Sequence, residues 1–462
     1  MNKEHIKSAI LIILIGMSVI LSWSLYTYQP DIALLDVSSR YVSNELIGEE
    51  RSLQEVIRPD QIVVHADGEK ALIPRDREDF YALLEKVSQA NYEADHVFMT
   101  EPYPLMTERG GIELVFPTSI PAEMFFAMLT LEDDYQTPIS EIDRAFLYIH
   151  DVHDQVYMQF YSSDERRVGS LKSNISVGEF ERLFIQNRDE YVTVRSLEEE
   201  RAQSSLMTEH VYVTTEPMMV DTLSYGASPI SIDLFRQSLF TDPSAVKYYQ
   251  QSDGEDSYTD GNRMINLRHN GTFMEYGNPM FSEVQELSKH VAQAGYEFIN
   301  GHGGWTDDYI LTNWMRLNNR EEVEFRLHMN GLPVFSIDGQ DLMKLSATRS
   351  GNQIVAYSRP LFDLDSVPLN TTQRVELPSG EDVVRSLQQD DYYERQRIAK
   401  VSLGYEMEMR NPTFVTLEPH WYVLYGNRWQ RIETSQVEAV SQGQTLDEEE
   451  EGAGDDDGLE SN

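Results

Sequence analysis

The chain has 462 residues, no cysteine, and 78 acidic against 37 basic residues, which gives a net charge of −41. A field of this sign disfavours nucleic acid, anionic lipid headgroups and polyanionic polymers as direct ligands. The length and the 40% share of hydrophobic residues predict two or three domains with a sizeable core. Because cysteine is absent, disulfide bonds and cysteine nucleophiles are excluded, and the domains must hold together by packing.

The N-terminal part contains an uncharged stretch, residues 8–30, that lies between Lys7 and Asp31. Its 23 residues suffice for a transmembrane helix, since about 20 apolar residues cross a bilayer at a rise of about 1.5 Å per residue. Lys3 and Lys7 precede the stretch, so the positive-inside rule places residues 1–7 in the cytoplasm. We predict a single-pass protein of the cell membrane whose bulk lies outside the cell.

The outer end of the predicted helix carries Trp23, Tyr26 and Tyr28. We interpret these residues as membrane-interface anchors, because amphipathic rings favour the headgroup level of a bilayer. A cleaved signal peptide is the alternative interpretation. It requires a cleavage site of small residues, which residues 24–28 do not provide.

One face of the predicted helix is a candidate interface with another membrane helix. Its members recur at spacings of three and four residues: Ser8, Leu11, Ile15, Ser18, Ser22 and Leu25. Small residues four apart, as at Ser18 and Ser22, permit close helix contact and interhelical hydrogen bonds worth about 0.6–2 kcal/mol. Small residues also occur in plain anchors, and a helix without a partner is therefore the alternative.

Residues 31–205 are predicted to form an N-terminal extracellular α/β domain. Phe80, Leu83, Leu84 and Val87 have the spacing of an amphipathic helix. Strands are expected at 61–65, 112–116 and 145–160, a helical run near 122–131, and a linker or exposed helix at 196–205.

Residues 206–370 are predicted to form a central α+β domain around two hairpins. Their turns are Asn270-Gly271 and Asn330-Gly331, and Asn-Gly is the strongest short signal for a hairpin. The flanking strands are expected at 264–269, 272–276, 322–329 and 332–337. Between the hairpins, a capping box at Ser282 and Gln285 predicts a helix that ends at Gly295.

Residues 371–435 are predicted to form a smaller C-terminal α+β domain. It has a helix around 383–387, a strand at 405–409 and a hairpin that turns at Gly426-Asn427. The central and C-terminal domains share an order of helix, Gly-Tyr pair and strands, which suggests a duplication marked by Gly295-Tyr296 and Gly404-Tyr405.

A disordered acidic tail is predicted for residues 436–462, because carboxylates and glycines dominate its end. The predicted fold class of the chain is α+β: a single N-terminal transmembrane helix followed by a multi-domain extracellular part of mixed, mainly antiparallel sheets with helices.

Patterns that indicate chemistry are few. His150 and His153 could approach one metal on a helix, but strand patterns on both sides favour a polar turn. Residues 301–305, Gly-His-Gly-Gly-Trp, are similar to a phosphate-binding loop, but Asp307 and Asp308 follow and would repel an anion, so a structural loop is favoured. We expect no enzymatic activity, and therefore no catalytic residue, metal or cofactor.

The chain opens with Lys3-Glu4-His5-Ile6-Lys7-Ser8, continues with an aliphatic run, and then reads Leu21-Ser22-Trp23-Ser24-Leu25-Tyr26-Thr27-Tyr28-Gln29-Pro30-Asp31. This opening resembles the YycH family of low-GC Gram-positive bacteria. The layout is also similar, with one anchor, a large extracellular part and aromatic hairpins near the end.

The resemblance implies a regulator of the WalK/WalR (YycG/YycF) two-component system, which governs cell-wall metabolism. It implies two partners reached through transmembrane helices, a sensor histidine kinase and a YycI-like bitopic protein, and it implies that the last two domains are YycI-like. The sign of control differs between lineages, and both signs stay open. The alternative function is a sensing or binding module for a wall fragment or an exported protein.

Overall fold

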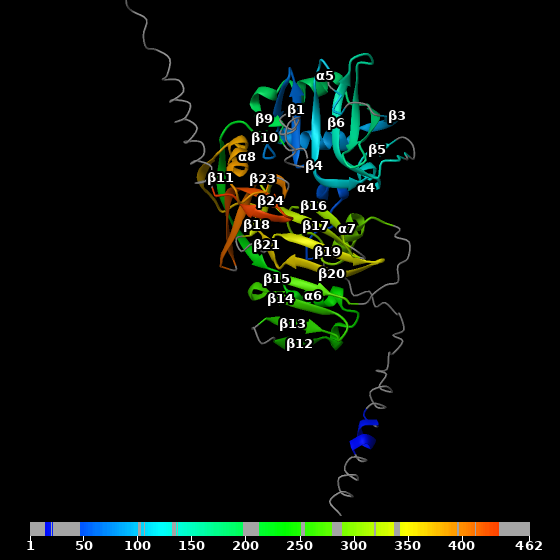
Figure 1. Cartoon of the computed structure of the whole chain (residues 1–462), viewed down its shortest axis with the longest axis vertical. Helices are drawn as coiled ribbons and strands as arrows, with labels where there is room; N and C mark the ends of the chain where they lie inside the picture. Colours follow the sequence, from blue (N-terminus) through cyan, green and yellow to red (C-terminus); the bar gives the residue numbers. More distant parts are fainter. Residues whose placement is uncertain are drawn as a thin grey trace, which may run out of the picture. The chain divides into compact units, whose positions relative to one another are not determined.

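The computed structural model (Figure 1) describes residues 14–19, 21, 47–99, 103–105, 107–131, 135, 137–196, 212–250, 255–279, 289–317, 320–336, 342–394, 397–411 and 413–433. The chain divides into two compact units, residues 1–44 and residues 45–462. Most of the predicted membrane helix lies outside the described residues, and residues 14–19 and 21 are helical. Within the described part of the chain, no helix is both long and apolar enough to span a membrane.

The first half of the larger unit is built on one sheet. Its strands are β1 (Gln61–Ala66), β2 (Glu69–Leu72), β3 (Asn91–Met99), β4 (Gly111–Pro121), β5 (Thr130–Leu131), β6 (Glu141–His150), β7 (Gln155–Ser162), β8 (Arg167–Ser173), β9 (Val192–Ser196) and β10 (Tyr212–Thr214). They lie in the order β10-β9-β2-β1-β4-β6-β7-β8-β3-β5. The helices are α2 (Leu53–Val56), α3 (Glu78–Gln89), α4 (Ala122–Ala127), α5 (Val177–Phe180), η1 (Glu181–Ile185) and η2 (Arg188–Glu190).

The helix α3 follows from its sequence pattern. Of the predicted stripe, Phe80, Leu83 and Val87 are buried and Leu84 is partly buried. Glu78 lies in the first turn and Lys86 in the last, where each charge complements the helix dipole. The prediction of this helix is confirmed.

The segment 145–160 forms two antiparallel strands, β6 and β7, as predicted. They pair from Arg144 opposite Tyr161 to His150 opposite Gln155, and residues 151–154 make the turn. The polar turn expected around His150 and His153 is therefore confirmed.

The second half is built on a sheet of 15 strands. Its strands are β11 (Met218–Pro229), β12 (Lys247–Gln250), β13 (Asp256–Thr259), β14 (Met264–Arg268), β15 (Phe273–Gly277), β16 (Tyr309–Leu317), β17 (Arg320–Met329), β18 (Leu332–Ser336), β19 (Lys344–Ser350), β20 (Gln353–Pro360), β21 (Phe362–Leu364), β22 (Asn370–Leu377), β23 (Ile398–Asn411), β24 (Phe414–Tyr425) and β25 (Arg428–Arg431). The helices are α6 (Ile232–Leu239), η4 (Pro243–Ala245), η5 (His269–Gly271), α7 (Val291–Gly301) and α8 (Gly380–Gln389).

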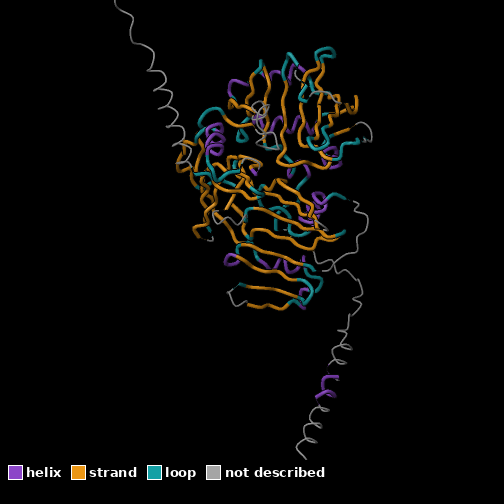
Figure 2. The backbone as a smooth tube through the Cα atoms, viewed as in Figure 1, coloured by secondary structure: helices purple, strands orange, loops and turns teal. Residues whose placement is uncertain are grey.

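The main path of this sheet runs β12-β13-β14-β15-β20-β19-β17-β18-β23-β24-β11-β21. β16 pairs with β17, β22 with β11, and β25 with β24. Among the described strands, the pairs β18–β23 and β3–β5 are parallel and the other pairs are antiparallel. Figure 2 shows how strands outweigh helices, and the predicted α+β class with mainly antiparallel sheets is confirmed.

The Asn-Gly hairpins form because these residues accept positive φ. Asn330 has φ 48° and Gly331 has φ 77° between β17 and β18, and Gly426 and Asn427 have φ 55° and 63° between β24 and β25. Asn270, with φ 57°, turns β14 into β15. All three predicted hairpins are confirmed.

The helix predicted to end at Gly295 is wrong in its boundary. Residues 280–288 lie outside the described part, and α7 begins at Val291 and continues through Gly295 to Gly301. A Cβ on Gly295 would lie 2.4 Å from Cγ1 of Val323 in β17. The glycine therefore serves close packing of the helix on the sheet instead of a helix end.

The Gly-Tyr marker of a duplication is also contradicted. Gly295-Tyr296 lies inside the helix α7, whereas Gly404-Tyr405 lies inside the strand β23. The two pairs hold different places in the fold, because the first glycine is required by helix-to-sheet packing and the second by the ring of Phe335, 2.5 Å from the position of a Cβ.

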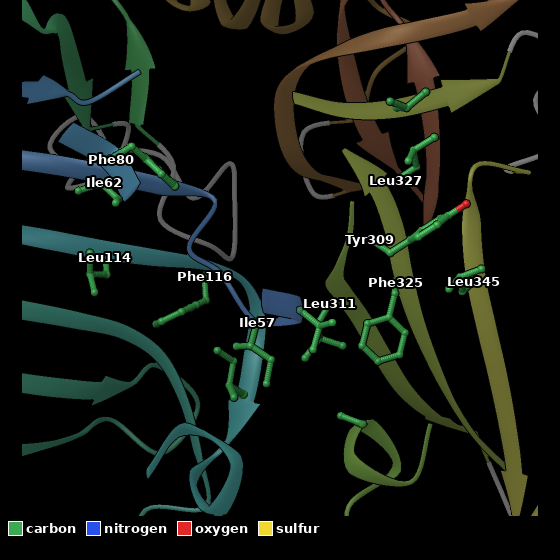
Figure 3. Close-up of a cluster of buried hydrophobic side chains, with 14 of the residues drawn as sticks. Ile57, Ile62, Phe80, Leu114, Phe116, Tyr309, Leu311, Phe325, Leu327 and Leu345 are labelled. Carbon is green, nitrogen blue, oxygen red and sulfur yellow. The ribbon is translucent and has the colours of Figure 1, made fainter. Parts of the chain in front are cut away.

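One hydrophobic core runs through both halves of the larger unit. Figure 3 shows Ile57 and Phe116 of the first half beside Leu311. Leu311 lies on β16 of the second sheet, opposite Phe325 on β17. Ile57 comes directly after α2, so the chain crosses between the halves near this point. The boundary predicted at residue 370 stays a prediction, and strands from both sides of it belong to the 15-stranded sheet.

Candidate functional site: the stem clamp and the cleft beside it

Residues 47–51, here called the stem, lie on the loop after α7, residues 302–308, here called the clamp loop. The amides of Ile47 and Gly48 donate to the carbonyl of Gly303 at 3.1 and 2.8 Å. Glu49 and Trp305 exchange two backbone hydrogen bonds of 2.9 Å, which form an antiparallel bridge. The stem is thereby attached to the second half of the unit before the chain enters the first sheet.

Glycines allow this close approach. A Cβ on Gly48 would lie 2.1 Å from the carbonyl oxygen of Trp305, and Gly303 and Gly304 have φ of 106° and 72°. Side chains other than glycine are strained at such φ values. The Gly-His-Gly-Gly-Trp sequence is therefore a structural loop, as the sequence favoured, and its role is to hold the stem.

Side chains of α7 and the clamp loop add a second layer of contacts. Oδ1 of Asn300 accepts hydrogen bonds from the amide of Arg51 at 3.1 Å and from Nε1 of Trp305 at 2.6 Å. The carbonyl of Arg51 accepts from the Tyr296 hydroxyl at 2.7 Å and from Nδ2 of Asn300 at 3.1 Å. Trp305 is buried and packs edge-on against Phe325 at 5.0 Å, so the clamp is anchored in the core.

The outer side of the clamp loop is electrostatic. Nη1 of Arg51 lies 3.2 Å from Oδ1 of Asp308, and Nη2 of Arg58 pairs with the same oxygen. The Asp308 side chain is 34% exposed, so water screens both pairs. The pair with Arg51 orients the stem, the pair with Arg58 involves the segment after α2, and both add little to stability.

The inner side of the clamp loop rests on Arg359 of β20. This side chain is fully buried, and its Nη1 donates to the Gly304 carbonyl at 3.0 Å while Nη2 donates to Oγ1 of Thr306 at 3.2 Å. Its guanidinium lies 5.0 Å from the ring centroid of Phe235 in α6. The loop is therefore held from within by a buried cation.

Asp307 points into the same interior. Its Oδ1 accepts from the Leu364 amide at 3.2 Å, and its Oδ2 has no hydrogen-bond partner within the described part of the chain. Burial raises the pKa of Asp307 to about 7, because desolvation outweighs the hydrogen bonds from Leu364 and Thr306. The clamp loop thus carries a buried carboxyl that titrates near neutrality.

A second buried carboxylate, Glu113 on β4, lies at the centre of a polar cluster in the first sheet. Its Oε2 lies 3.0 Å from Nε2 of His65, its Oε1 lies 3.0 Å from Nη1 of Arg144, and the Tyr212 hydroxyl donates to Oε2. Burial alone would raise the pKa of Glu113, but the hydrogen bond with His65 and the charge of Arg144 lower it to about 2. Tyr212 belongs to β10, the edge strand of the same sheet, so this cluster ties the edge strand to β4.

A cleft of about 1570 Å³ opens between the two halves of the unit. Eight Lys or Arg and seven Asp or Glu residues line it, whereas the whole chain has 37 basic and 78 acidic residues. The cleft is therefore close to electrically neutral in a strongly acidic protein. An anionic or neutral ligand meets less repulsion here than elsewhere on the surface.

Aromatic rings form one wall of the cleft. Phe335 of β18 stacks on Tyr422 of β24 at 4.0 Å and lies 5.2 Å from Trp429 of β25. The guanidinium of Arg326 lies 4.5 Å from the Phe335 ring centroid, and Arg431 pairs with Glu406 at 2.5 Å. Phe335 and Tyr422 are buried within this wall, and Trp429 is partly exposed, so Trp429 is the ring that a ligand in the cleft could contact.

His150 and His153 do not converge on a metal. Their rings stack at 4.3 Å, Nδ1 of His150 accepts from the Val152 amide at 3.2 Å, and Nδ1 of His153 lies 2.8 Å from the Tyr157 hydroxyl. The described residues contain no group of three or more His, Asp or Glu side chains placed to hold a metal.

The predicted membrane interface is described at two positions. Ile15 and Ser18 lie one helical turn apart and are exposed. The other members, Ser8, Leu11, Ser22 and Leu25, and the anchors Trp23, Tyr26 and Tyr28 lie outside the described residues. Both sets stay predictions.

The stem clamp and the Glu113 cluster were not found from the sequence. The glycines around Trp305 were the one local signal for the clamp, because consecutive glycines mark a close backbone approach. No local pattern indicates that His65 contacts Glu113 and Tyr212, because these partners lie 48 and 147 residues from it along the chain.

The fold and this site define a two-halved scaffold that holds the segment entering it, with an adjoining cleft. Two family models match the chain: the N-terminal domain of YycH protein over residues 4–188 and the C-terminal domain of YycH protein over residues 208–439. The chain belongs to the YycH family.

A relative from Bacillus subtilis (strain 168) is the two-component system WalR/WalK regulatory protein YycH. It is 21% identical over 444 residues, which cover 91% of this chain and 94% of the relative. The crystal structure of YycH from Bacillus subtilis matches with a TM-score of 0.67 at 16% identity, over 84% of this chain and 99% of that chain. The fold is therefore that of YycH, and the relative is named as a regulatory protein, not as an enzyme.

Proposed function

We propose that this protein is a non-enzymatic, membrane-anchored regulator of a WalK-like sensor histidine kinase that controls cell-wall metabolism. It acts with a YycI-like bitopic partner through transmembrane helix contacts, with its N-terminus in the cytoplasm and its bulk outside the cell. The observation that carries the proposal is the match of both YycH family models together with the regulatory name of the relative.

The energetic demand on such a regulator is small. A two-state kinase shifts its population when a partner contacts the two states with free energies that differ by a few kcal/mol. The face that contains Ser18 and Ser22 offers small residues for close contact, and each interhelical hydrogen bond is worth about 0.6–2 kcal/mol. The stem clamp supports the proposal, because it fixes the segment that follows the predicted anchor to the ectodomain.

The test is co-purification from membranes. Full-length protein is compared with a version whose residues 8–28 are replaced by an unrelated spanning helix. We expect a sensor kinase and a second bitopic protein to come down with the native helix and not with the replacement. Equal capture by both versions would place recognition in the ectodomain, and capture by neither would overturn the proposal.

A residue-level test addresses the helix face. Ser18→Leu and Ser22→Leu together should change expression of the kinase's target genes severalfold, because leucine blocks close helix approach. Val19→Leu is the matched control, since it enlarges a residue outside the predicted face. Unchanged target expression in the double variant would remove this interface from the proposal.

The cleft favours a second candidate function, a binding module for a wall fragment or an exported protein. Its volume, its neutral lining and its aromatic wall are the supporting observations. Trp429→Ala should impair regulation in this case, while Tyr248→Ala, which removes an exposed ring on β12, should not. A version that keeps the anchor and lacks residues 32–462 would stay active if helix contact alone sufficed.

A further inference from the structure

The clamp loop joins the stem on its outer side to a buried carboxyl on its inner side. The amides of Ile47, Gly48 and Glu49 donate to the loop backbone, whereas the Arg51 amide donates to Asn300 of α7, outside the loop. Two residues beyond Trp305, the Asp307 side chain enters the interior and accepts from Leu364 of β21. The stem contacts at Gly303 and Trp305 and the buried contact at Asp307 therefore lie within five residues of one loop.

The surroundings of Asp307 leave its negative charge poorly compensated. Arg359 of β20 favours the ionised form through space, but the donors of Arg359 are directed to Gly304, Thr306, Pro360 and Tyr357. Asp363 of β21 disfavours the ionised form. The site therefore suits a neutral carboxyl.

We propose that the clamp loop is a pH-sensitive latch on the stem. With the Asp307 carboxyl protonated, the loop stays seated on β21 and holds residues 47–49. Once the carboxylate forms, water solvates it better than the protein interior does, and the loop opens and releases the stem. This property belongs to the ectodomain and holds whether or not the proposed kinase regulation is correct.

The direction of the pH dependence follows from proton linkage. Burial raises the pKa of Asp307 from its ordinary 3.8 to about 7 in the closed loop. The closed state therefore keeps its proton between about pH 4 and pH 7 while an open, solvated carboxyl loses it. Opening should increase about tenfold per pH unit over this window and level off above pH 7, because one pKa unit is a factor of ten.

Other charged groups around the loop must be separated from Asp307. Burial lowers the pKa of His302 at the start of the clamp loop, so His302 favours opening as the pH falls. Asp308, Arg51 and Arg58 lie on the outer side of the loop. A comparison with Asp307→Asn removes their contribution, since all four residues are common to both proteins.

The experiment is hydrogen–deuterium exchange of the full chain in detergent micelles from pH 5 to pH 9, read on peptides that cover residues 47–51. The measured quantity is the protection of the stem in wild type divided by that in Asp307→Asn at the same pH. We expect this ratio to fall about tenfold per pH unit up to about pH 7 and then to stay constant. A ratio independent of pH would overturn the latch.

A second variant keeps the test decisive if Asp307→Asn folds poorly, which near-ultraviolet circular dichroism would show. Asp363→Asn removes a charge that disfavours ionisation of Asp307. The pH above which stem protection stays constant should therefore be lower in this variant than in wild type. Exposed Asp233→Asn on α6 is the matched control and should leave the profile in place. A levelling point that Asp363→Asn does not move would also contradict the latch.

Discussion

Glu113 and Asp307 are both almost completely buried, yet their surroundings move the two pKa values in opposite directions. Glu113 has His65, Arg144 and Tyr212 within hydrogen-bond reach, and its pKa falls to about 2. Asp307 has hydrogen bonds from the Leu364 amide and from Thr306 but no cationic partner in direct contact among the described residues, and burial raises its pKa to about 7. Direct partners decide whether a buried carboxyl is a fixed charge or a titrating one.

The difference corresponds to two kinds of contact between segments. Glu113 ties β4 to the edge strand β10 of the same sheet through hydrogen bonds with His65, Arg144 and Tyr212, and its carboxylate stays ionised at physiological pH. Asp307 seats a loop whose other side holds the stem. We infer that the first contact is permanent and the second is adjustable, and four substitutions test this contrast.

The largest effect is expected for Glu113→Gln. Removing the carboxylate leaves Arg144 and His65 without their anionic partner in the interior, and breaking a buried pair costs about 3–5 kcal/mol. Urea unfolding at pH 7 measures this loss, with exposed Glu108→Gln as the control. Wild type should also lose this stabilisation as the pH falls from about 4.5 toward 2, because the folded pKa is depressed. A loss below 1 kcal/mol would contradict the fixed-charge interpretation.

The contribution of Asp307 to stability should depend on pH in the opposite direction, and Asp307→Asn tests this. Because the folded pKa of Asp307 is raised, its contribution to stability is full below pH 3.8 and is lost as the pH rises to about 7. The stability of Asp307→Asn relative to wild type should therefore increase by about 3 kcal/mol between pH 5 and pH 8. Urea unfolding at the two pH values measures the change, and a constant difference would show that Asp307 does not titrate in this window.

Gly48→Ala tests the stem contact itself. The new Cβ would lie 2.1 Å from the Trp305 carbonyl oxygen, so the backbone must shift, at a cost of about 1–3 kcal/mol. Faster amide exchange in residues 47–51 should accompany the loss. Gly178→Ala is the matched control, since no atom lies within 4 Å of its Cβ position. Equal exchange in both variants would show that the close approach at Gly48 does not contribute to holding the stem.

Asp308→Asn should have the smallest effect. Its ion pairs with Arg51 and Arg58 are partly exposed, and such pairs contribute about 0–1 kcal/mol that added salt diminishes. The measurement is urea unfolding with and without 1 M salt, where about 1 M screens charges beyond roughly 3 Å. A loss as large as that of Gly48→Ala would mean that charge, and not backbone bonding, holds the stem.

The secondary structure was largely predictable because its causes are local. The stripe of Phe80, Leu83 and Val87 predicted α3, and Asn330-Gly331 predicted a hairpin, since positive φ favours those residue types. The end of a helix at Gly295 was wrong for the opposite reason. Whether a glycine ends a helix or permits close packing depends on Val323, which lies in another element.

The candidate site likewise has features that the sequence predicted and features that it did not. The opening motif resembles the YycH family, and the matches of both family models confirm the family. The membrane face from Ser8 to Leu25 stays a prediction. Asp307 was read in the sequence as a residue that repels anions, and its burial beneath Arg359 and Leu364 could not be foreseen.

The sequence by itself determined the acidic character of this protein and the absence of disulfide bonds, which follow from composition. It also determined the hairpins, the amphipathic helices and the family resemblance, because these depend on residues close together in the chain. Tertiary structure alone decided that residues 47–51 are held by a loop more than 250 residues away and that Asp307 is buried while Asp308 beside it is not. Those features depend on which distant side chains meet and on how much water they exclude, and no local pattern encodes either quantity.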